Sequence, residues 1–169
     1  MIFRKKNKTR DIKKQARKSL SGKFAKEKTI YVVDTSAIIN KFVSQLVKKG
    51  ISGKIIIPNV VMAELENLAN KGREEGFLGL EEVARFHKLK TQFPIQIYFY
   101  GNRANEMQIK FAKSGEIDAI IRDVAIKNKA LLITADLVQA KTAQAYNIEV
   151  IFLKPKHLPK KKKFLFWRK

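Results

Sequence analysis

The chain has 169 residues, a net charge of +21 at pH 7 and no cysteine. This length is enough for one domain with a hydrophobic core, and it excludes two large domains. The lack of cysteine excludes disulfides and thiolate zinc sites, so any bound metal must be held by oxygen atoms or by the two histidines.

The positive charge is concentrated at the two ends of the chain. Residues 1–28 hold 12 lysines and arginines against 2 acids, and residues 154–169 hold 8 against none, whereas residues 29–153 hold 16 against 13. We therefore predict a basic N-terminal arm (1–28), one globular domain (29–153) and a basic-aromatic C-terminal tail (154–169). Such arms can bind polyanions, and nucleic acid is a stronger candidate than anionic membrane lipid. The alternative is that they are solvated ends that only improve solubility.

The sequence contains no run of about 18 apolar residues, and no apolar segment follows the basic N-terminus. We expect neither a membrane span nor a secretory signal. The expected location is the cytoplasm, and membrane is an unlikely partner.

From Thr29 onward, short β-branched or aromatic runs alternate with longer helical patterns, which is typical of a parallel sheet wrapped by helices. Strands are expected near 29–34, 54–57, 95–100, 130–134 and 148–152. Helices are expected near 36–48, 58–70, 79–91, 104–113, 117–128 and 137–146. Pro58 suits a first helical turn, Gly50, Gly72 and Gly115 suit breaks, and 71–76 suits an exposed loop.

Glu64 lies on the apolar side of the helix expected over 58–70. A turn of about 100° per residue places it in one arc with Val60, Val61, Leu65 and Leu68. Glu66 points the opposite way and is an ordinary solvent-facing acid. A carboxylate in a buried stripe is costly unless something positive holds it, so Glu64 is the clearest single sign of a site.

Asp118 lies at one edge of the buried face of the helix expected over 117–128. That face consists of Ile117, Ile120, Ile121, Val124 and Ala125. Arg122 follows Asp118 by one turn on the same side. It is interpreted either as the partner of Asp118 in an ion pair or as a contact for phosphate.

Asp34 and Asp136 each come directly after a predicted strand. An aspartate there commonly caps the next helix, and Gln139 after Asp136 is typical of a capping box. Taken together with Glu64, however, capping does not explain the set.

Two hydroxyls stand beside these acids in the sequence. Ser36 and Thr134 either orient a metal-binding carboxylate or are ordinary polar residues at a helix start and a strand end. Thr35 is interpreted as ordinary.

The four acids are expected to meet at one end of the sheet. Ligands of open parallel sheets bind beyond the carboxyl ends of the strands, at the point where the strand order reverses. If the first and fourth strands are neighbours there, Asp34 and Asp136 converge while Glu64 and Asp118 approach from flanking helices. Four carboxylates repel one another unless divalent cations are present, and Mg²⁺ or Mn²⁺ suits oxygen ligands. We therefore predict that all four are metal ligands and catalytic residues for cleavage of phosphodiesters.

Other side chains are candidates for contact with nucleic acid. They are Lys71, Arg73, Arg122, Lys160, Lys161, Lys162, Lys163 and Trp167. The aromatic residues of the tail suit stacking on unpaired bases. His87 and His157 have no partner at metal-ligand spacing and are given no role.

Four segments carry a resemblance to a known family. They are Val-Val-Asp34-Thr-Ser36, Ile57-Pro-Asn-Val-Val-Met-Ala-Glu64, Gly115-Glu-Ile-Asp118 and Leu-Ile-Thr134-Ala-Asp136. By these segments the chain resembles the PIN-domain nucleases over roughly 29–153. The stretch 69–77 is most similar to archaeal proteins in which a PIN domain is joined to an ATPase and a KH module.

The resemblance implies an α/β/α sandwich of three layers, with a five-stranded parallel sheet in the order 3-2-1-4-5. It also implies Mg²⁺- or Mn²⁺-dependent endonuclease action, usually on RNA, with all four acidic positions present. A P-loop of the form G-x-x-x-x-G-K-[ST] is absent, so ATP-driven work is not expected of this chain alone.

Several partners and one other function remain open at this point. The partners are a second copy of the chain, a separate ATPase, or an antitoxin if the protein is a toxin-type ribonuclease, although the basic arms favour processing or repair. The alternative function is a non-catalytic nucleic-acid-binding or docking module that works with a separate partner.

Overall fold

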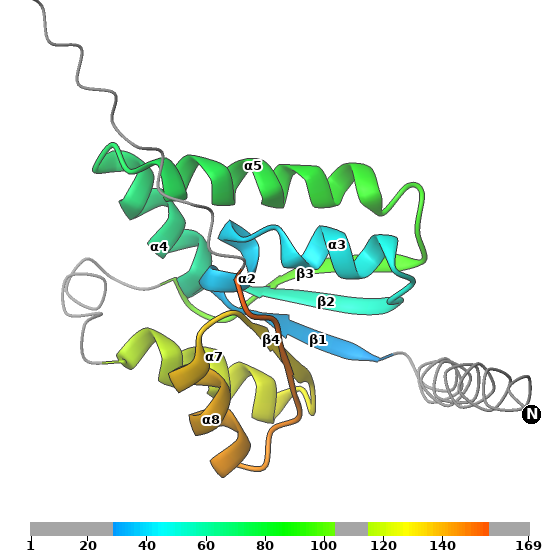
Figure 1. Cartoon of the computed structure of the whole chain (residues 1–169), viewed down its shortest axis with the longest axis vertical. Coiled ribbons are helices and arrows are strands. Elements are labelled where there is room, and N and C mark those ends of the chain that lie inside the picture. Colours follow the sequence, from blue (N-terminus) through cyan, green and yellow to red (C-terminus); the bar gives the residue numbers. More distant parts are fainter. Residues whose placement is uncertain (1–28, 104–114, 156–169) are drawn as a thin grey trace, which may run out of the picture.

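A five-stranded parallel sheet forms the centre of the molecule (Figure 1), and the computed structural model describes residues 29–103 and 115–155. The strands are β1 (Ile30–Val33), β2 (Gly53–Pro58), β3 (Ile95–Tyr100), β4 (Leu131–Thr134) and β5 (Val150–Phe152). Their order in the sheet is β3-β2-β1-β4-β5, and every pair is parallel. The predicted fold class and strand order are confirmed.

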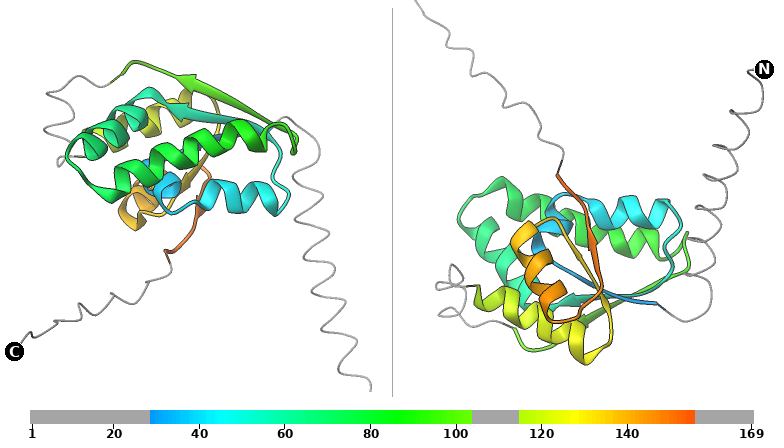
Figure 2. Two further views of the ribbon diagram at one scale, coloured as in Figure 1. Left: turned by 90° about the horizontal axis from the view of Figure 1, so that it is seen from above. Right: turned by 60° about the horizontal axis from the view of Figure 1, so that its bottom comes forward.

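Six helices surround this sheet in the described residues. They are α2 (Thr35–Ile39), α3 (Phe42–Lys48), α4 (Asn59–Asn70), α5 (Glu74–Leu89), α7 (Glu116–Lys127) and α8 (Leu137–Ala145). Helices α3 and α5 lie over one face of the sheet and α7 and α8 over the other, which makes the three layers visible in Figures 1 and 2. None of the helices among these residues is long and apolar enough to span a membrane.

The core lies along the central strands. Tyr31, Val32 and Val33 of β1 are fully buried, as are the three isoleucines 55–57 of β2. Parallel strands that are covered on both faces read as continuous apolar runs, and these two strands follow that rule. Register pairs Ile30 with Lys54 and Val33 with Ile133, so the carboxyl ends of β1 and β4 lie side by side.

The single helix expected over 36–48 is wrong, because the structure has two short helices there. Lys41 adopts a left-handed conformation with a φ of 57°, which breaks the helical path. The side chain of Asn40 donates to the backbone oxygen of Ser36 and satisfies the end of α2. The break redirects the chain so that Phe42 and Val43 enter the core.

The loop expected over 71–76 is shorter than predicted, since α5 begins at Glu74 rather than near residue 79. Gly72, with a φ of 69°, provides the turn between α4 and α5. A side chain at Gly76 would place its Cβ only 2.2 Å from the backbone nitrogen of Ala69, so glycine is required for the two helices to approach this closely. This packing fixes α4, and with it Glu64.

The other boundaries follow the expectations closely. Gly50 and Gly115 occupy breaks and have positive φ angles, as expected. Pro58 ends β2 and precedes the first residue of α4 instead of lying within its first turn. The helix expected over 104–113 lies outside the described residues, as do the arm 1–28 and most of the tail, so the three-part division remains a prediction.

Candidate active site

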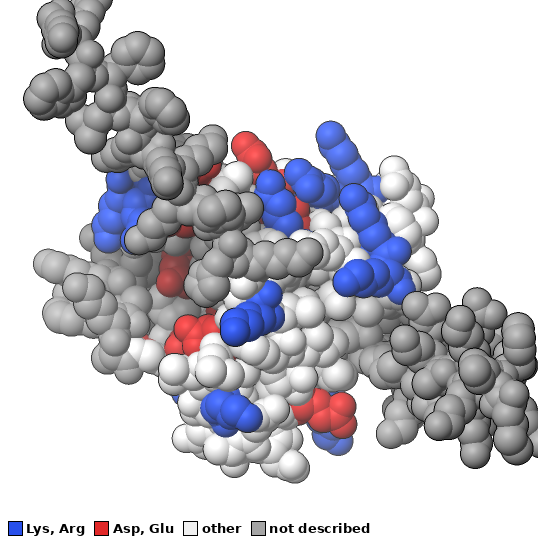
Figure 3. All heavy atoms as spheres, viewed as in Figure 1, with Lys and Arg blue, Asp and Glu red and all other residues white. Residues whose placement is uncertain are grey.

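Four acidic side chains gather beyond the carboxyl ends of the strands. Asp34 follows β1 directly, Asp136 follows β4 by two residues, Glu64 comes from α4 and Asp118 from the first turn of α7. The charges of Asp34, Asp136 and Glu64 all raise the pKa of Asp118, so the four carboxylates lie within one another's electrostatic field. Acidic side chains are visible on this face between α4 and α8 in Figure 3.

Asp34 is almost completely buried, with 4% of its surface exposed. The hydroxyls of Ser36 and Thr134 both donate to its Oδ2 atom, each at 2.6 Å. Its side chain makes no capping bond to α2, so the capping explanation does not apply to it. Burial raises the pKa of Asp34 above its usual range, and the two hydroxyl bonds oppose that rise.

The same two hydroxyls also receive backbone N–H groups. Ala135 donates to the Ser36 Oγ at 2.9 Å, and Asp136 donates to the Thr134 Oγ1 at 3.0 Å. Each hydroxyl has one proton, which goes to Asp34, so the 3.2 Å contact between the hydroxyls is a close approach rather than a further bond. This network fastens the end of β1 to the turn after β4 and sets Asp136 beside Asp34.

Glu64 lies on the partly buried side of α4, next to the buried residues Val60, Val61 and Leu65, as its helical phase predicts. The Thr35 hydroxyl donates to its Oε2 at 2.5 Å. Burial raises the pKa of the Glu64 carboxyl, the Thr35 bond lowers it, and the charge of Asp34 raises it further. The interpretation of Thr35 as an ordinary polar residue is wrong, because it links the start of α2 to α4 at the site.

Asp118 is only partly buried, and its pKa is raised to about 6 by burial and by the three neighbouring acids. Arg122 lowers this pKa through its charge, but the described residues contain no ion pair between the two. Instead, Arg122 donates from Nη1 to the Oε1 of Gln139 at 2.5 Å. Gln139 in turn donates from Nε2 to the backbone oxygen of Asp118 at 3.1 Å.

Asp136 caps α8, since its Oδ1 accepts the backbone N–H of Gln139 at 2.9 Å. The reciprocal half of the predicted capping box is not formed, because the Gln139 side chain joins α8 to α7. Sequence reasoning missed this function of the glutamine. In the structure Gln139 is buried, which is unusual for a polar residue in the first turns of a helix. That burial is not evident from the sequence, so no sequence signal indicated this function.

As the side chains stand, no three acidic or histidine residues within 29–103 and 115–155 are arranged to hold a metal ion. The donors nevertheless suit a hard cation, since they are carboxylate and hydroxyl oxygens. Arg122 is the only described cation that shifts the pKa of Asp34, Glu64 or Asp118. The cluster therefore has an excess of negative charge that a divalent ion would relieve.

The cationic residues expected to contact nucleic acid are distributed differently. Lys71 and Arg73 are exposed in the turn between α4 and α5, where cationic side chains are visible in Figure 3. Arg73 forms an ion pair with Glu75 at 3.1 Å, which leaves its side chain at the surface. Lys160 to Lys163 and Trp167 lie outside the described residues.

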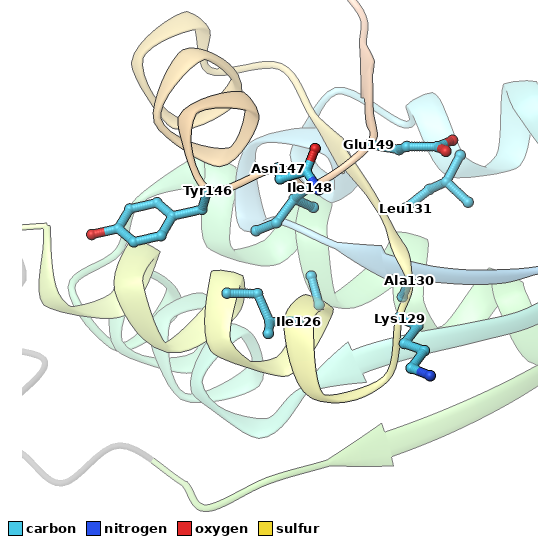
Figure 4. Close-up of a pocket in the computed structure, with 9 residues that line it drawn as sticks. Ile126, Lys129, Ala130, Leu131, Tyr146, Asn147, Ile148 and Glu149 are labelled. Carbon is cyan, nitrogen blue, oxygen red and sulfur yellow. The ribbon is translucent and has the colours of Figure 1, made fainter.

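The cavity drawn in Figure 4 does not coincide with the acidic cluster. It has a volume of about 420 Å³ and lies where α7 and α8 end and β4 and β5 begin, at the opposite edge of the sheet. Ile126, Tyr146 and Ile148 provide much of its lining. Its titratable lining residues are Lys129, Tyr146 and Glu149, which include only one acid, so the acidic end of the sheet is the stronger candidate for a metal site.

Replacing Thr35 with valine should lower the free energy of unfolding by about 1 kcal/mol, because the hydroxyl bond to the Glu64 carboxylate is lost. Urea denaturation at neutral pH measures this change. The Thr35→Ser variant retains the hydroxyl and serves as the control. Equal stability of the two variants would contradict the assigned contact.

Comparison with protein families shows what this architecture is similar to. Residues 31–145 match the family model described as the PIN domain. Over 123 residues the chain is 41% identical to a KH- and PIN-domain-containing protein of Methanocaldococcus jannaschii, a match that covers 72% of this chain and 19% of that protein. It is 23% identical over 122 residues to a Holliday junction branch migration ATPase of Sulfolobus acidocaldarius, covering 72% and 22% respectively.

A solved structure agrees with these matches. A domain of a functionally unknown protein of Methanocaldococcus jannaschii has a TM-score of 0.71 and 38% identity, with coverage of 78% of this chain and 95% of that one. The chain spans only about a fifth of the length of the two relatives named above.

Proposed function

The chain belongs to the PIN-domain family, whose members are generally nucleases, and we propose that it is a divalent-metal-dependent endonuclease acting on RNA. The observation that carries the proposal is the placement of four acids together beyond the carboxyl ends of β1 and β4, with Asp34 and Glu64 held by hydroxyl groups; burial and the neighbouring acids raise the pKa of Asp118 to about 6. A purely structural role does not explain why these acids lie together. Negative charges that are close to one another raise one another's pKa and destabilise the folded protein, unlike the opposite charges of an ion pair.

Asp34, Glu64, Asp118 and Asp136 are the residues that would hold Mg²⁺ or Mn²⁺. The chemistry supplied by the bound ion is activation of a water molecule and neutralisation of charge on the scissile phosphate. Asp34 is the most rigid of the four, since two hydroxyls hold one of its oxygens. Ser36 and Thr134 thus orient the carboxylate, and the Thr35 hydroxyl orients Glu64 in the same way.

RNA is the substrate that we propose. A net charge of +21 attracts polyanions, and KH modules, which a relative contains beside its PIN domain, bind single-stranded nucleic acid. DNA remains the alternative polymer, since another relative is a Holliday junction ATPase. Lys71 and Arg73 are the exposed described cations that we propose as phosphate contacts from the α4–α5 turn.

The test is incubation of the protein with labelled single-stranded RNA, duplex RNA and branched DNA, in Mn²⁺, in Mg²⁺ and in EDTA. Cleavage of RNA in the presence of metal, and none in EDTA, is the expected result. Intact RNA in all three buffers would contradict the proposal, and cleavage of branched DNA alone would change the substrate.

A second candidate function is a nucleic-acid-binding or docking module without catalysis. It is favoured by the absence of a ready three-residue metal group in the described residues. Under this proposal a separate partner, such as an ATPase, would act on the bound nucleic acid. RNA that is bound tightly yet remains intact with Mn²⁺ would support this second function.

A further inference from the structure

On one side of the edge strand β3 the side chains are exposed in the described structure, whereas Ile56 and Pro58 of β2 on the same side are buried. Side chains alternate along a strand, so Gln96, Tyr98 and Tyr100 of β3 share one side with Lys54 of β2. Tyr98 is 43% exposed and Tyr100 is 42% exposed, although both are large aromatic residues. These four residues are called the tyrosine face below. Strand β3 is one of the two edge strands of the sheet, as Figure 2 shows.

The tyrosine face is held in place by its own contacts. The hydroxyl of Tyr98 donates to the Oε1 of Gln96 at 3.1 Å. The Nζ of Lys54 lies 4.3 Å from the centre of the Tyr98 ring, a cation–π contact. The ring is therefore fixed in orientation while much of it stays accessible to solvent, so little side-chain entropy is lost when a ligand stacks on it.

Beyond Tyr100 the surface is hollowed. A cavity of about 580 Å³ is lined by Tyr100, Asn102, Arg103 and Lys127, among others. It begins at the carboxyl end of β3, the same edge of the sheet at which the four acids lie. The tyrosine face and this cavity share Tyr100, and the cavity is also lined by Ile120 and Asp123 of α7, the helix that carries Asp118.

We propose that the tyrosine face binds a single strand of RNA, with successive bases stacked on Tyr98 and Tyr100. Two residues along a strand span about 6.6 Å, so the rings stand as neighbouring platforms for consecutive bases. Aromatic rings on a sheet face, interleaved with cations, are a general means of binding unpaired bases. This inference rests on the proposed function and specifies its substrate as unpaired RNA.

The positive charge of the lysines near the tyrosine face favours nucleic acid over other ligands. Lys54 and Lys127 form no ion pair among the described residues, although Lys54 also contacts the Tyr98 ring, so neither charge is neutralised by an acid. The basic segments 1–28 and 154–169, of this chain or of a second copy, carry most of the positive charge and would be repelled by these lysines. A polyanion with flat, apolar bases satisfies both the tyrosines and the lysines.

The experiment measures binding without cleavage. A labelled, unstructured oligouridine of about 20 nucleotides and a duplex RNA of equal length are titrated with the full chain in EDTA, at two salt concentrations. Tyr98→Ala and Tyr100→Ala are each expected to weaken single-strand binding about tenfold. The ratio to wild type should be the same at both salt concentrations, because stacking releases no counterions.

Matched variants separate stacking from other effects. Tyr98→Phe and Tyr100→Phe retain the rings and are expected to bind within about twofold of wild type. Thermal melting of each variant confirms that the domain is folded.

Three results would overturn the inference: alanine variants that bind within twofold of wild type, phenylalanine variants as weak as alanine, or an equal loss on duplex RNA. Cleavage assays of the same proteins separate this inference from the nuclease proposal. If wild type does not cleave but the alanine variants lose binding, only the nuclease proposal fails. If wild type cleaves and the alanine variants retain its KM, only the tyrosine face fails.

Discussion

The Asp118→Asn protein is expected to lose metal-dependent RNA cleavage by more than a hundredfold while keeping its fold. Asparagine has nearly the same shape but lacks the negative charge that a divalent cation requires. Loss of a group that merely supports a metal ligand typically costs 10- to 100-fold, so loss of a ligand should exceed that range. Initial cleavage rates in Mn²⁺, on the RNA that wild type cuts fastest, measure the effect.

Glu116→Gln provides a matched control for this experiment. Glu116 lies two residues earlier in the first turn of α7, loses the same charge on substitution, and is exposed to solvent. We expect it to cleave at a rate close to wild type. Equal cleavage by Asp118→Asn and Glu116→Gln would show that the acidic cluster is not the catalytic site.

The same Asp118→Asn substitution is expected to stabilise the metal-free protein at neutral pH. The pKa of Asp118 is about 6 in the folded protein, against 3.8 for the free side chain, so folding disfavours its charged form. At about 1.36 kcal/mol per pKa unit the shift corresponds to roughly 3 kcal/mol. Because Asp118 is partly exposed and solvent screens its neighbours, we expect about 2 kcal/mol, measured as a rise in the urea midpoint in EDTA.

The pH dependence of this difference has a defined sign. A raised carboxyl pKa contributes stability that is complete below pH 3.8 and is lost as the pH rises through about 6. The advantage of Asp118→Asn over wild type should therefore be small near pH 3.5 and large near pH 7.5. Addition of Mn²⁺ should remove it, because the cation stabilises only the charged wild-type cluster.

An advantage that is equal at both pH values would indicate that charge repulsion does not act on Asp118. A destabilised variant would show that the carboxylate is needed for the fold. The activity and stability experiments together test a common physical idea, that the site is kept at the expense of stability in the metal-free chain.

Much of the fold was predictable because its signals are local. The buried strands β1 and β2 are continuous apolar runs, and their alternation with helical patterns indicates a parallel sheet. The split between α2 and α3 was not predictable, since Lys41 has no intrinsic preference for a left-handed conformation. The early start of α5 depends on the close approach of Gly76 to α4, which is a tertiary contact.

By itself, the sequence determined the order of the elements and the identity of four acids as a set. A carboxylate that interrupts an apolar stripe, as Glu64 does, is visible in the helical period because water and apolar side chains sort residues onto faces.

Only the tertiary structure decided which polar groups serve those acids. Thr35 reaches Glu64 across 29 positions, and Thr134 reaches Asp34 across 100. Gln139 joins α8 to the backbone of Asp118 rather than closing a capping box. Periodicity says which face a side chain occupies, but a hydrogen bond depends on the distance and angle between two atoms, and the packing of separate elements sets both.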